Sequence, residues 1–337
     1  MSSRRHQRGV ALLVAILLVA LGTIIAAAMA YNNAMTARRT AATLGFDQAL
    51  LVAQGAEALA AYGLQLTTKA GVKFIGPGQP WNQPFPPTEV APGVTLEASV
   101  EDMQSRFNIN NLVNMDGETP NPTAIAVFQR LLQRLGMDPK WAYYIVDWID
   151  QDSTPMSPDG AEDSVYMEMD PPYRTPNMPV TSTSELMALP GFTRADFDRL
   201  APHIAALPIG TKVNTCTGDP YVLDALAGVE QFTAMSEEEF EKERQAAGGV
   251  CFPENFKVST ANVTGGTASL GSSTGTPNGV PNGTQQTTPQ DLVGQTSTWF
   301  RLSSIVTVGS SEFSVYTLLY YDPATGARPM MRSFTPD

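Results

Sequence analysis

The stretch from Trp141 to Tyr173 carries eight carboxylates and no lysine or arginine. Oxygen ligands on a loop that also contains prolines and a glycine suit calcium better than zinc or copper. Two of the carboxylates fall where a helix is expected to end, and there they oppose the helix dipole. A cation is therefore expected near these residues, which are Asp147, Asp150, Asp152, Asp159, Glu162, Asp163, Glu168 and Asp170.

Five of the eight carboxylates are the predicted calcium ligands: Asp150, Asp152, Asp159, Glu162 and Asp163. Asp147 is expected to face the helix interior or to act as a cap. The Asp150-x-Asp152 spacing begins like an EF-hand loop, but the third ligand, the glycine and the terminal glutamate are not in register, so an EF-hand is excluded. A solvated acidic loop without a bound ion is the alternative.

Few residues are available for other site chemistry. The chain has two histidines, His6 and His203, and two cysteines, Cys216 and Cys251. One chain therefore cannot assemble a Cys/His zinc site or an iron–sulfur cluster. A catalytic triad would have to use His203, and no nucleophile-elbow motif is present. The net charge of -12 disfavours binding to nucleic acid, whose phosphates it repels. We therefore predict a protein that is not an enzyme.

The elements around the acidic loop read mostly as helices, because apolar residues recur at helical spacing before and after it. One part, LPGFTRADFDRLAPHIAAL followed by KVNTCTGDPYVLDAL, resembles a helix-hairpin-helix pair, a module that often holds DNA phosphates. It lacks the second glycine and is surrounded by acidic residues, so we interpret it as a helical packing unit. The helical runs are Ala124–Leu135, Lys140–Ile149, Thr183–Leu189 and Arg194–Leu207.

An uncharged run of 22 residues, Val10–Tyr31, lies near the N-terminus. As a helix it would be roughly 33 Å long, which is enough to cross a bilayer. Arg4, Arg5 and Arg8 precede the run and are expected to stay in the cytoplasm, which places the rest of the chain across the membrane. A signal peptide cleaved near Ala30 is the alternative, although the run is long for one.

The same helix is expected to continue past the membrane, because no proline occurs before Pro77 and good helix formers dominate. Beyond Tyr31 the apolar residues fall within one arc of a helix. We therefore predict a single helix of about 55 residues, whose second half packs on a soluble domain through this arc. The arc consists of Leu44, Leu51, Val52, Leu59 and Tyr62.

The two cysteines are 35 positions apart and both follow the membrane segment. In an oxidising compartment they are expected to form a disulfide, with two free thiols as the alternative. Between them, Ser236–Arg244 is typical of a capped, solvated helix.

The C-terminal part begins with a linker or flexible loop, Asn262–Ser297, which is rich in Gly, Thr and Ser. Three alternating segments then predict antiparallel strands, and Val94–Val100 predicts one more after a proline-rich turn region that starts at Pro77. Together these strands would cover the soluble half of the long helix. The three C-terminal segments are TWFRLSSIVTVG, EFSVYTLLYYD and ARPMMRSF.

A short basic leader ending in Gly9, an apolar run from Val10 and an amphipathic continuation resemble a type IV pilin or a type II secretion pseudopilin. The resemblance implies that a prepilin peptidase cleaves after Gly9 and methylates Val10. Most members carry a glutamate at the fifth mature position, where this chain has Val14. A buried carboxylate needs a partner, typically the N-terminal amine of the subunit above, so a subunit with nothing above it needs none.

Further motifs, in chain order RFNINNLV, DWIDQD, GAEDSVY, PPYRTPN and TSTSELMALPGF, resemble the large minor pseudopilin of type II secretion, the protein K family. This resemblance implies an α+β pseudopilin fold, a long N-terminal transmembrane helix packed on an antiparallel sheet, with an inserted α-helical domain. It also implies calcium binding and the absence of the fifth-position glutamate. The expected segments are a leader (1–9), a transmembrane half-helix (10–31), a soluble half-helix with first sheet elements (32–104), the insertion (105–296) and C-terminal strands (297–337).

The resemblance predicts a subunit at the tip of the type II secretion pseudopilus, anchored by one pass in the inner membrane with its C-terminal domain in the periplasm. The implied partners are the minor pseudopilins I and J, the other pseudopilins and the prepilin peptidase. An insertion of about 190 residues would obstruct stacking along a shaft but not at its end. A type IV pilus minor pilin or adhesin, and a secreted calcium-dependent enzyme, are the alternatives.

Overall fold

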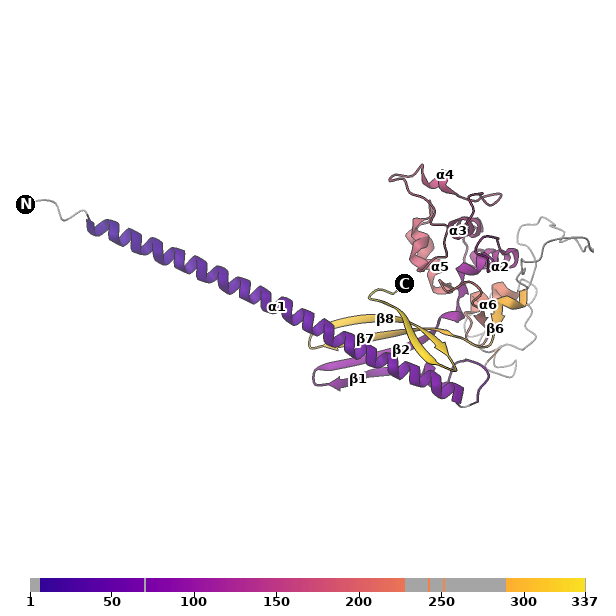
Figure 1. Cartoon of the computed structure of the whole chain (residues 1–337), viewed down its shortest axis with the longest axis horizontal. Helices are drawn as coiled ribbons and strands as arrows, with labels where there is room; N and C mark the ends of the chain where they lie inside the picture. Colours follow the sequence, from indigo (N-terminus) through magenta and orange to yellow (C-terminus); the bar gives the residue numbers. More distant parts are fainter. Residues whose placement is uncertain (1–6, 70, 228–241, 243–250, 252–288, 337) are drawn as a thin grey trace, which may run out of the picture.

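A computed structural model describes residues 7–69, 71–227, 242, 251 and 289–336. Helix α1 (Gln7–Lys69) is 63 residues long and projects from a head that holds all the other elements (Figure 1). Within the described residues it is the one helix long and apolar enough to cross a membrane. The predicted continuous helix is confirmed, and it is longer than the sequence suggested.

The first half of the head is a five-stranded antiparallel sheet in the order β1-β2-β7-β8-β9, built from residues on both sides of the helical half in the sequence. The four predicted strands are confirmed, but β1 was expected to be part of a turn region because of its two prolines. Pro86 and Pro87 are tolerated because β1 is an edge strand and its pairing with β2 is interrupted between Phe85 and Thr88, so neither proline has to donate to the ladder. The strands are β1 (Phe85–Ala91), β2 (Val94–Asp102), β7 (Trp299–Val308), β8 (Ser311–Asp322) and β9 (Gly326–Ser333).

The face of α1 that packs on the sheet differs from the predicted one. Leu44, Leu51, Leu59 and Tyr62 were expected to be buried there, but they are 54% to 68% exposed, and only Val52 of that arc packs against the core. Small side chains allow the helix to lie close to the strands, which explains why an alanine arc is buried instead. The buried arc consists of Ala49, Ala53, Ala56, Ala60 and Leu64.

The second half of the head is mainly helical and has its own hydrophobic core, formed by residues between Phe107 and Ala227 together with Leu292. Helices α2 and α3 confirm two predicted helices, whereas the third run forms a 3-10 turn, Thr183–Ala188. The fourth run stays helical only to Leu200, because Pro202 follows. The helices are α2 (Pro122–Arg134), α3 (Trp141–Ile149), α4 (Asp163–Tyr166), α5 (Arg194–Leu200) and α6 (Pro220–Ala227).

Two short parallel ladders join distant segments of the helical half. Strand β3 (Phe107–Asn108) pairs with β4 (Ile204–Ala205), and β5 (Val213–Asn214) pairs with β6 (Val293–Gly294). Further 3-10 turns cover Pro80–Asn82, Met103–Ser105, Ile109–Leu112, Ala201–His203 and Pro289–Leu292.

Three buried asparagines of the RFNINNLV motif connect the start of the helical half to two later segments. Asn108 Oδ1 accepts a hydrogen bond from Leu207 N at 3.0 Å, and Asn111 Oδ1 accepts one from Gly210 N at 2.8 Å. Asn110 reaches Val180 as well as Leu207. The motif therefore joins backbone segments that lie 70 to 100 residues further along the chain. An amide side chain can do this because it donates to C=O groups and accepts from N–H groups.

A buried carboxylate links the two halves of the head where the chain passes between them. Asp102 at the end of β2 accepts hydrogen bonds from Ser297 Oγ (2.6 Å), Asn214 Nδ2 (3.1 Å) and Thr217 Oγ1. Residues 289–297 were expected to belong to a flexible loop, but they form a 3-10 turn and β6, and Ser297 is buried. The rest of the predicted loop and the predicted helix 236–244, apart from Lys242, lie outside the described residues.

Candidate metal centre

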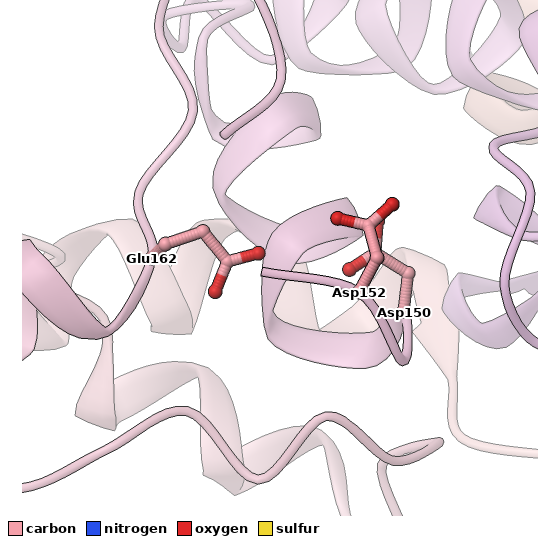
Figure 2. A group of neighbouring side chains, drawn as sticks. All are labelled: Asp150, Asp152 and Glu162. Atoms are coloured by element: carbon pink, nitrogen blue, oxygen red, sulfur yellow. The ribbon is translucent and has the colours of Figure 1, made fainter. Parts of the chain in front are cut away.

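Three carboxylates meet beside the C-terminus of α3. Asp150 and Asp152 follow the last helical residue, Ile149, and Glu162 stands directly before α4. One ligand oxygen of each residue lies within 4.8 Å of the corresponding oxygens of the other two. Figure 2 shows Glu162 approaching on its own segment from one side, with Asp150 and Asp152 together on the other.

Two of these carboxylates are almost completely buried, and each has an oxygen without a partner. Asp150 is 1% exposed and Glu162 is 3% exposed. Asp150 Oδ1 and Glu162 Oε1 are shielded from solvent and accept no hydrogen bond from any residue that the structure describes. Burying an unpaired carboxylate oxygen is costly, whereas a bound cation would satisfy it. The unpartnered oxygens therefore fit a metal site.

The electrostatics of the site lead to the same conclusion. Burial raises the pKa of Asp150 to about 7, and the charges of Asp152 and Asp147 add to the effect. Burial also raises the pKa of Glu162 to about 7, with further contributions from Asp147 and Asp152. Burial and neighbouring negative charges both disfavour ionisation of a carboxyl group. A bound divalent cation would offset both, because it interacts favourably with the charged form of each carboxylate.

Asp147 organises the loop instead of pointing an unpaired oxygen at the site. It is fully buried, and its two oxygens accept a hydrogen bond from Met156 N at 3.0 Å and 3.1 Å. A Cβ atom on Gly160 would collide with Asp147 Oδ2 and with the Met156 backbone. The loop can therefore fold around Asp147, and so bring Glu162 to the site, only with glycine at position 160.

The structure separates the other two predicted ligands from the cluster. Asp163 accepts hydrogen bonds from Thr175 N and Thr175 Oγ1, both at 3.2 Å, and lies 3.6 Å from Arg174 Nη1. Asp159 is exposed. Of the five predicted ligands, three gather and two do not. The sequence reasoning missed Gly160, although a glycine inside the acidic segment could have drawn attention to a tight loop.

Three further buried polar atoms near the loop also have no hydrogen-bond partner among the residues that the structure describes: Trp148 Nε1 on α3, Tyr166 OH at the end of α4, and Asn177 Oδ1. The amide nitrogen of Asn177 donates to Asp152 O at 2.8 Å, and the Trp148 and Tyr166 rings lie 5.2 Å apart. Burial raises the pKa of Tyr166 above its ordinary value, and the charges of Asp147 and Glu162 contribute. Tyr166 therefore lies close enough to Asp147 and Glu162 for their charges to act on it through a poorly solvated space, where electrostatic interactions are stronger than in water.

An oxygen-only cluster of this size suits calcium. Calcium binds oxygen at about 2.3 to 2.6 Å, so two ligands of one ion are separated by at most about 5 Å. The 4.8 Å limit observed here meets that condition. Smaller magnesium requires shorter distances and usually keeps several waters, which a largely buried pair of carboxylates does not favour.

The remaining sequence-predicted residues lie elsewhere. Gly9, Val10 and Val14 are all within α1, and the Val10 and Val14 side chains are exposed. The predicted disulfide is confirmed between Cys216 and Cys251. His203 Nδ1 lies 3.0 Å from Asp219 Oδ1, which also caps α6 by accepting hydrogen bonds from Tyr221 N and Val222 N.

Comparison with known proteins gives a consistent result. Residues 105–209 match the family described as type II secretion system (T2SS), protein K. The chain is 35% identical over 253 residues to type II secretion system protein K of Klebsiella pneumoniae, covering 72% of this chain and 77% of that protein. It is 31% identical over 331 residues to protein K of Pectobacterium carotovorum, covering 94% and 93%.

The fold also matches a chain in the crystal structure of the GspK-GspI-GspJ complex from enterotoxigenic Escherichia coli. The TM-score is 0.65 at 22% identity, and the match covers 89% of this chain and all of that one. A long apolar helix on an antiparallel sheet with added helices is the α+β pseudopilin fold that the sequence predicted. The chain belongs to the type II secretion system protein K family, the large minor pseudopilins.

Proposed function

We propose that this protein is the tip subunit of a type II secretion pseudopilus and assembles there with the minor pseudopilins I and J. It is an assembly protein without catalytic activity, and it starts and caps the filament. The observation that carries the proposal is an exposed apolar stripe along α1, on the side of the helix away from the sheet.

The stripe consists of Leu44, Leu51, Leu59, Tyr62 and Leu66, which are 38% to 68% exposed. It extends for about 33 Å along the helix. The charged residues of α1 between 32 and 66 all lie off this arc, at Arg38, Arg39, Asp47 and Glu57. A helix that buries alanines and exposes leucines has its larger apolar face available for a partner. Burial of each large side chain would contribute about 1.5 to 3 kcal/mol.

Three observations support the position at the tip. The solved relative was crystallised as a complex with GspI and GspJ, which indicates the partners to test for this chain. Val14 occupies the position where a shaft subunit carries its carboxylate, so an overlying subunit would find no charge to pair with. The helical half also adds bulk beside the sheet (Figure 1), and such bulk obstructs stacking along a shaft.

We also propose that α1 crosses the inner membrane once and that the head lies in the periplasm. The basic residues Arg4, Arg5 and Arg8 precede the apolar segment, which favours a cytoplasmic N-terminus. The Cys216–Cys251 disulfide in the head suits an oxidising compartment.

Calcium is the cation we propose for the cluster of Asp150, Asp152 and Glu162. When bound, it would supply positive charge to the two unpartnered oxygens and tie the end of α3 to the segment before α4. Its role would be structural: the loop between Asp150 and Glu162 would be fixed in one conformation. Asp147 and Gly160 would hold the loop in the shape that presents Glu162.

Association is tested by co-expressing the full chain with the minor pseudopilins I and J and purifying the complex in detergent. We expect Leu51→Asp to reduce recovery of the partners at least tenfold, because it places a charge among the apolar side chains of the stripe. Gln54→Asp, an exposed change off the stripe, is the matched control and should leave recovery unchanged. Equal recovery from both variants would contradict the assembly proposal.

Tip location is tested by gold labelling of the head on pseudopili. We expect one label at one end of each filament, and label along the shaft would overturn the proposal. Processing is tested by N-terminal sequencing of mature protein. Cleavage by prepilin peptidase predicts N-methylated Val10 as the first residue, whereas a start at Tyr31 would instead support a secreted protein.

The calcium proposal is tested by thermal unfolding with calcium and with chelator. We expect a higher Tm with calcium, and loss of the difference in the double variant Asp150→Asn, Asp152→Asn. Asp159→Asn is the matched control, since it removes a carboxylate of the same loop that lies outside the cluster. Identical thermal unfolding curves for the unaltered protein with calcium and with chelator would contradict the calcium proposal.

A further inference from the structure

A pocket of about 150 Å³ opens beside the stripe, between α1 and the β1–β2 hairpin. On the helix side its wall is formed by Ala56, Ala60 and Gly63, whose small side chains leave the space empty, and by Leu59. Ala98 of β2 lines the opposite side. Of the described residues that line it, Gln83 and Ser99 are polar and none is charged.

The pocket is held open by rigid contacts around it. Gly63 allows the turn Pro80–Asn82 to lie against α1, because a Cβ atom at position 63 would be only 3.3 Å from Trp81 Cα. The Trp81 ring is buried, 5.3 Å from the ring of Phe300, and its Nε1 donates to Gln79 Oε1 at 2.9 Å. With these groups fixed, the walls cannot move together to fill the space.

We infer that this pocket receives one large apolar side chain from the N-terminal helix of a partner pseudopilin that lies along the stripe. Leu59 belongs to both features: it is 54% exposed as part of the stripe, and it forms one wall of the pocket. A helix packed on the stripe therefore passes the mouth of the pocket. The inference rests on the proposed assembly function and adds the contact that positions the partner along the helix.

The chemistry of the lining defines the occupant. A cavity of about 150 Å³ with apolar walls is large enough for a benzene-sized group, which corresponds to a Leu, Met or Phe side chain. A side chain that fills a preformed apolar pocket is the usual central anchor of a protein interface. A side chain seated in the pocket would also fix where the partner helix lies along α1. The stripe alone does not, because its leucines would pack similarly if the partner helix slid along it.

The inference is tested by filling the pocket. Ala98→Leu adds apolar volume to the wall facing α1, so it should leave the Tm of the full chain unchanged or higher. We expect recovery of the partner pseudopilins to fall at least tenfold. Glu97→Leu is the matched control, because it introduces the same residue one position earlier on the opposite face of β2, and it should leave recovery unchanged.

A second measurement identifies the occupant directly. The photo-reactive residue benzoylphenylalanine replaces Gln83 at the pocket mouth in one variant and Glu97 in another. We expect a crosslink from position 83 to the N-terminal helix of a partner pseudopilin and none from position 97. A crosslink from position 83 only to lipid or to a second copy of this chain would overturn the inference. The crosslink from position 83 also tests the inference if Ala98→Leu lowers the Tm, because it does not depend on that variant.

The outcomes separate the two proposals. If Leu51→Asp prevents association but Ala98→Leu does not, the pocket is not an anchor site, and the assembly function stands. If neither variant affects association, the assembly function itself is wrong. If both variants prevent association and position 83 crosslinks to the partner helix, both proposals hold.

Discussion

Glu57 on α1 and Arg332 on β9 form a bidentate ion pair between the long helix and the sheet. Arg332 Nε lies 2.7 Å from Glu57 Oε1, and Arg332 Nη2 lies 2.8 Å from Glu57 Oε2. Thr317 Oγ1 also donates to Glu57 Oε1 at 2.9 Å. Glu57 is 8% exposed. The pair attaches the last strand, at the edge of the sheet, to the long helix.

Removing Arg332 is expected to lower the free energy of unfolding more than removing the charge of Glu57. Arg332→Met leaves a buried carboxylate without its cation and should lower the free energy of unfolding by about 3 kcal/mol. Glu57→Gln leaves a half-exposed arginine that water can solvate, and should cost about 1 kcal/mol. Urea unfolding of the detergent-solubilised chain measures both, with the exposed Arg328→Met as control. Equal losses would show that burial of Glu57 does not dominate.

Gly160→Ala is expected to abolish the calcium response although it changes no ligand. The added Cβ atom would collide with Asp147 Oδ2 and the Met156 backbone, so the segment that carries Glu162 must move. The Tm with calcium should equal the Tm with chelator. Gly294→Ala makes the same substitution in β6, where the added Cβ atom would lie 3.6 Å from Lys212 Cδ, an ordinary contact, and it should retain the calcium response. An unchanged response in Gly160→Ala would show that the loop has room to adjust.

The stability of the chelated protein is expected to fall as the pH rises from 5 to 8. Asp150 and Glu162 have pKa values of about 7 and Asp147 of about 6, all above the ordinary values near 4. Groups with a raised pKa bind extra protons in the folded state, so their stabilisation is complete below about pH 4 and is lost through pH 6 to 7.

With saturating calcium this decrease should disappear, because the ion and not a proton then compensates the carboxylates. Urea unfolding at several pH values, with chelator and with calcium, measures the difference between the two profiles. Parallel profiles would contradict the assignment of the titrating groups to the cation site.

Asn110→Ala is expected to destabilise the helical half strongly. The Asn110 amide donates to Val180 O at 2.9 Å and to Leu207 O at 2.8 Å, and its oxygen accepts from Val180 N at 2.9 Å. Truncation leaves these three buried backbone groups unpaired, at a cost of about 3 kcal/mol or more. Asn82→Ala, at an exposed position, is the control. A loss below 1 kcal/mol would indicate that water replaces the amide.

Several features of the fold follow from local sequence alone. The proline-free run, uncharged from Val10 to Tyr31 and rich in good helix formers beyond it, determines a continuous helix, because nothing in it interrupts the backbone hydrogen bonds. Alternating residues between Trp299 and Ser333 determine three strands, since a period of two suits only a pleated chain. The oxygen-rich loop after α3 likewise excludes soft metals whatever its shape.

Tertiary contacts decided the rest. Helical periodicity marks both a leucine arc and an alanine arc on α1, and only the close approach of the sheet selects the alanines. Strand β1 forms despite Pro86 and Pro87 because its outer edge is free and its pairing with β2 is irregular between Phe85 and Thr88, where the two prolines lie. Neither result is visible in a local pattern, since each depends on a neighbour far away in the chain.

The acidic loop shows the same division most clearly. The sequence determined that five carboxylates, Asp150, Asp152, Asp159, Glu162 and Asp163, were available as oxygen ligands. Which of them meet was decided by the fold of the loop around the buried Asp147, with Gly160 permitting the close contact. That fold brings Glu162 to Asp150 and Asp152, because the distance between side chains depends on the path of the backbone and not on their spacing in the sequence.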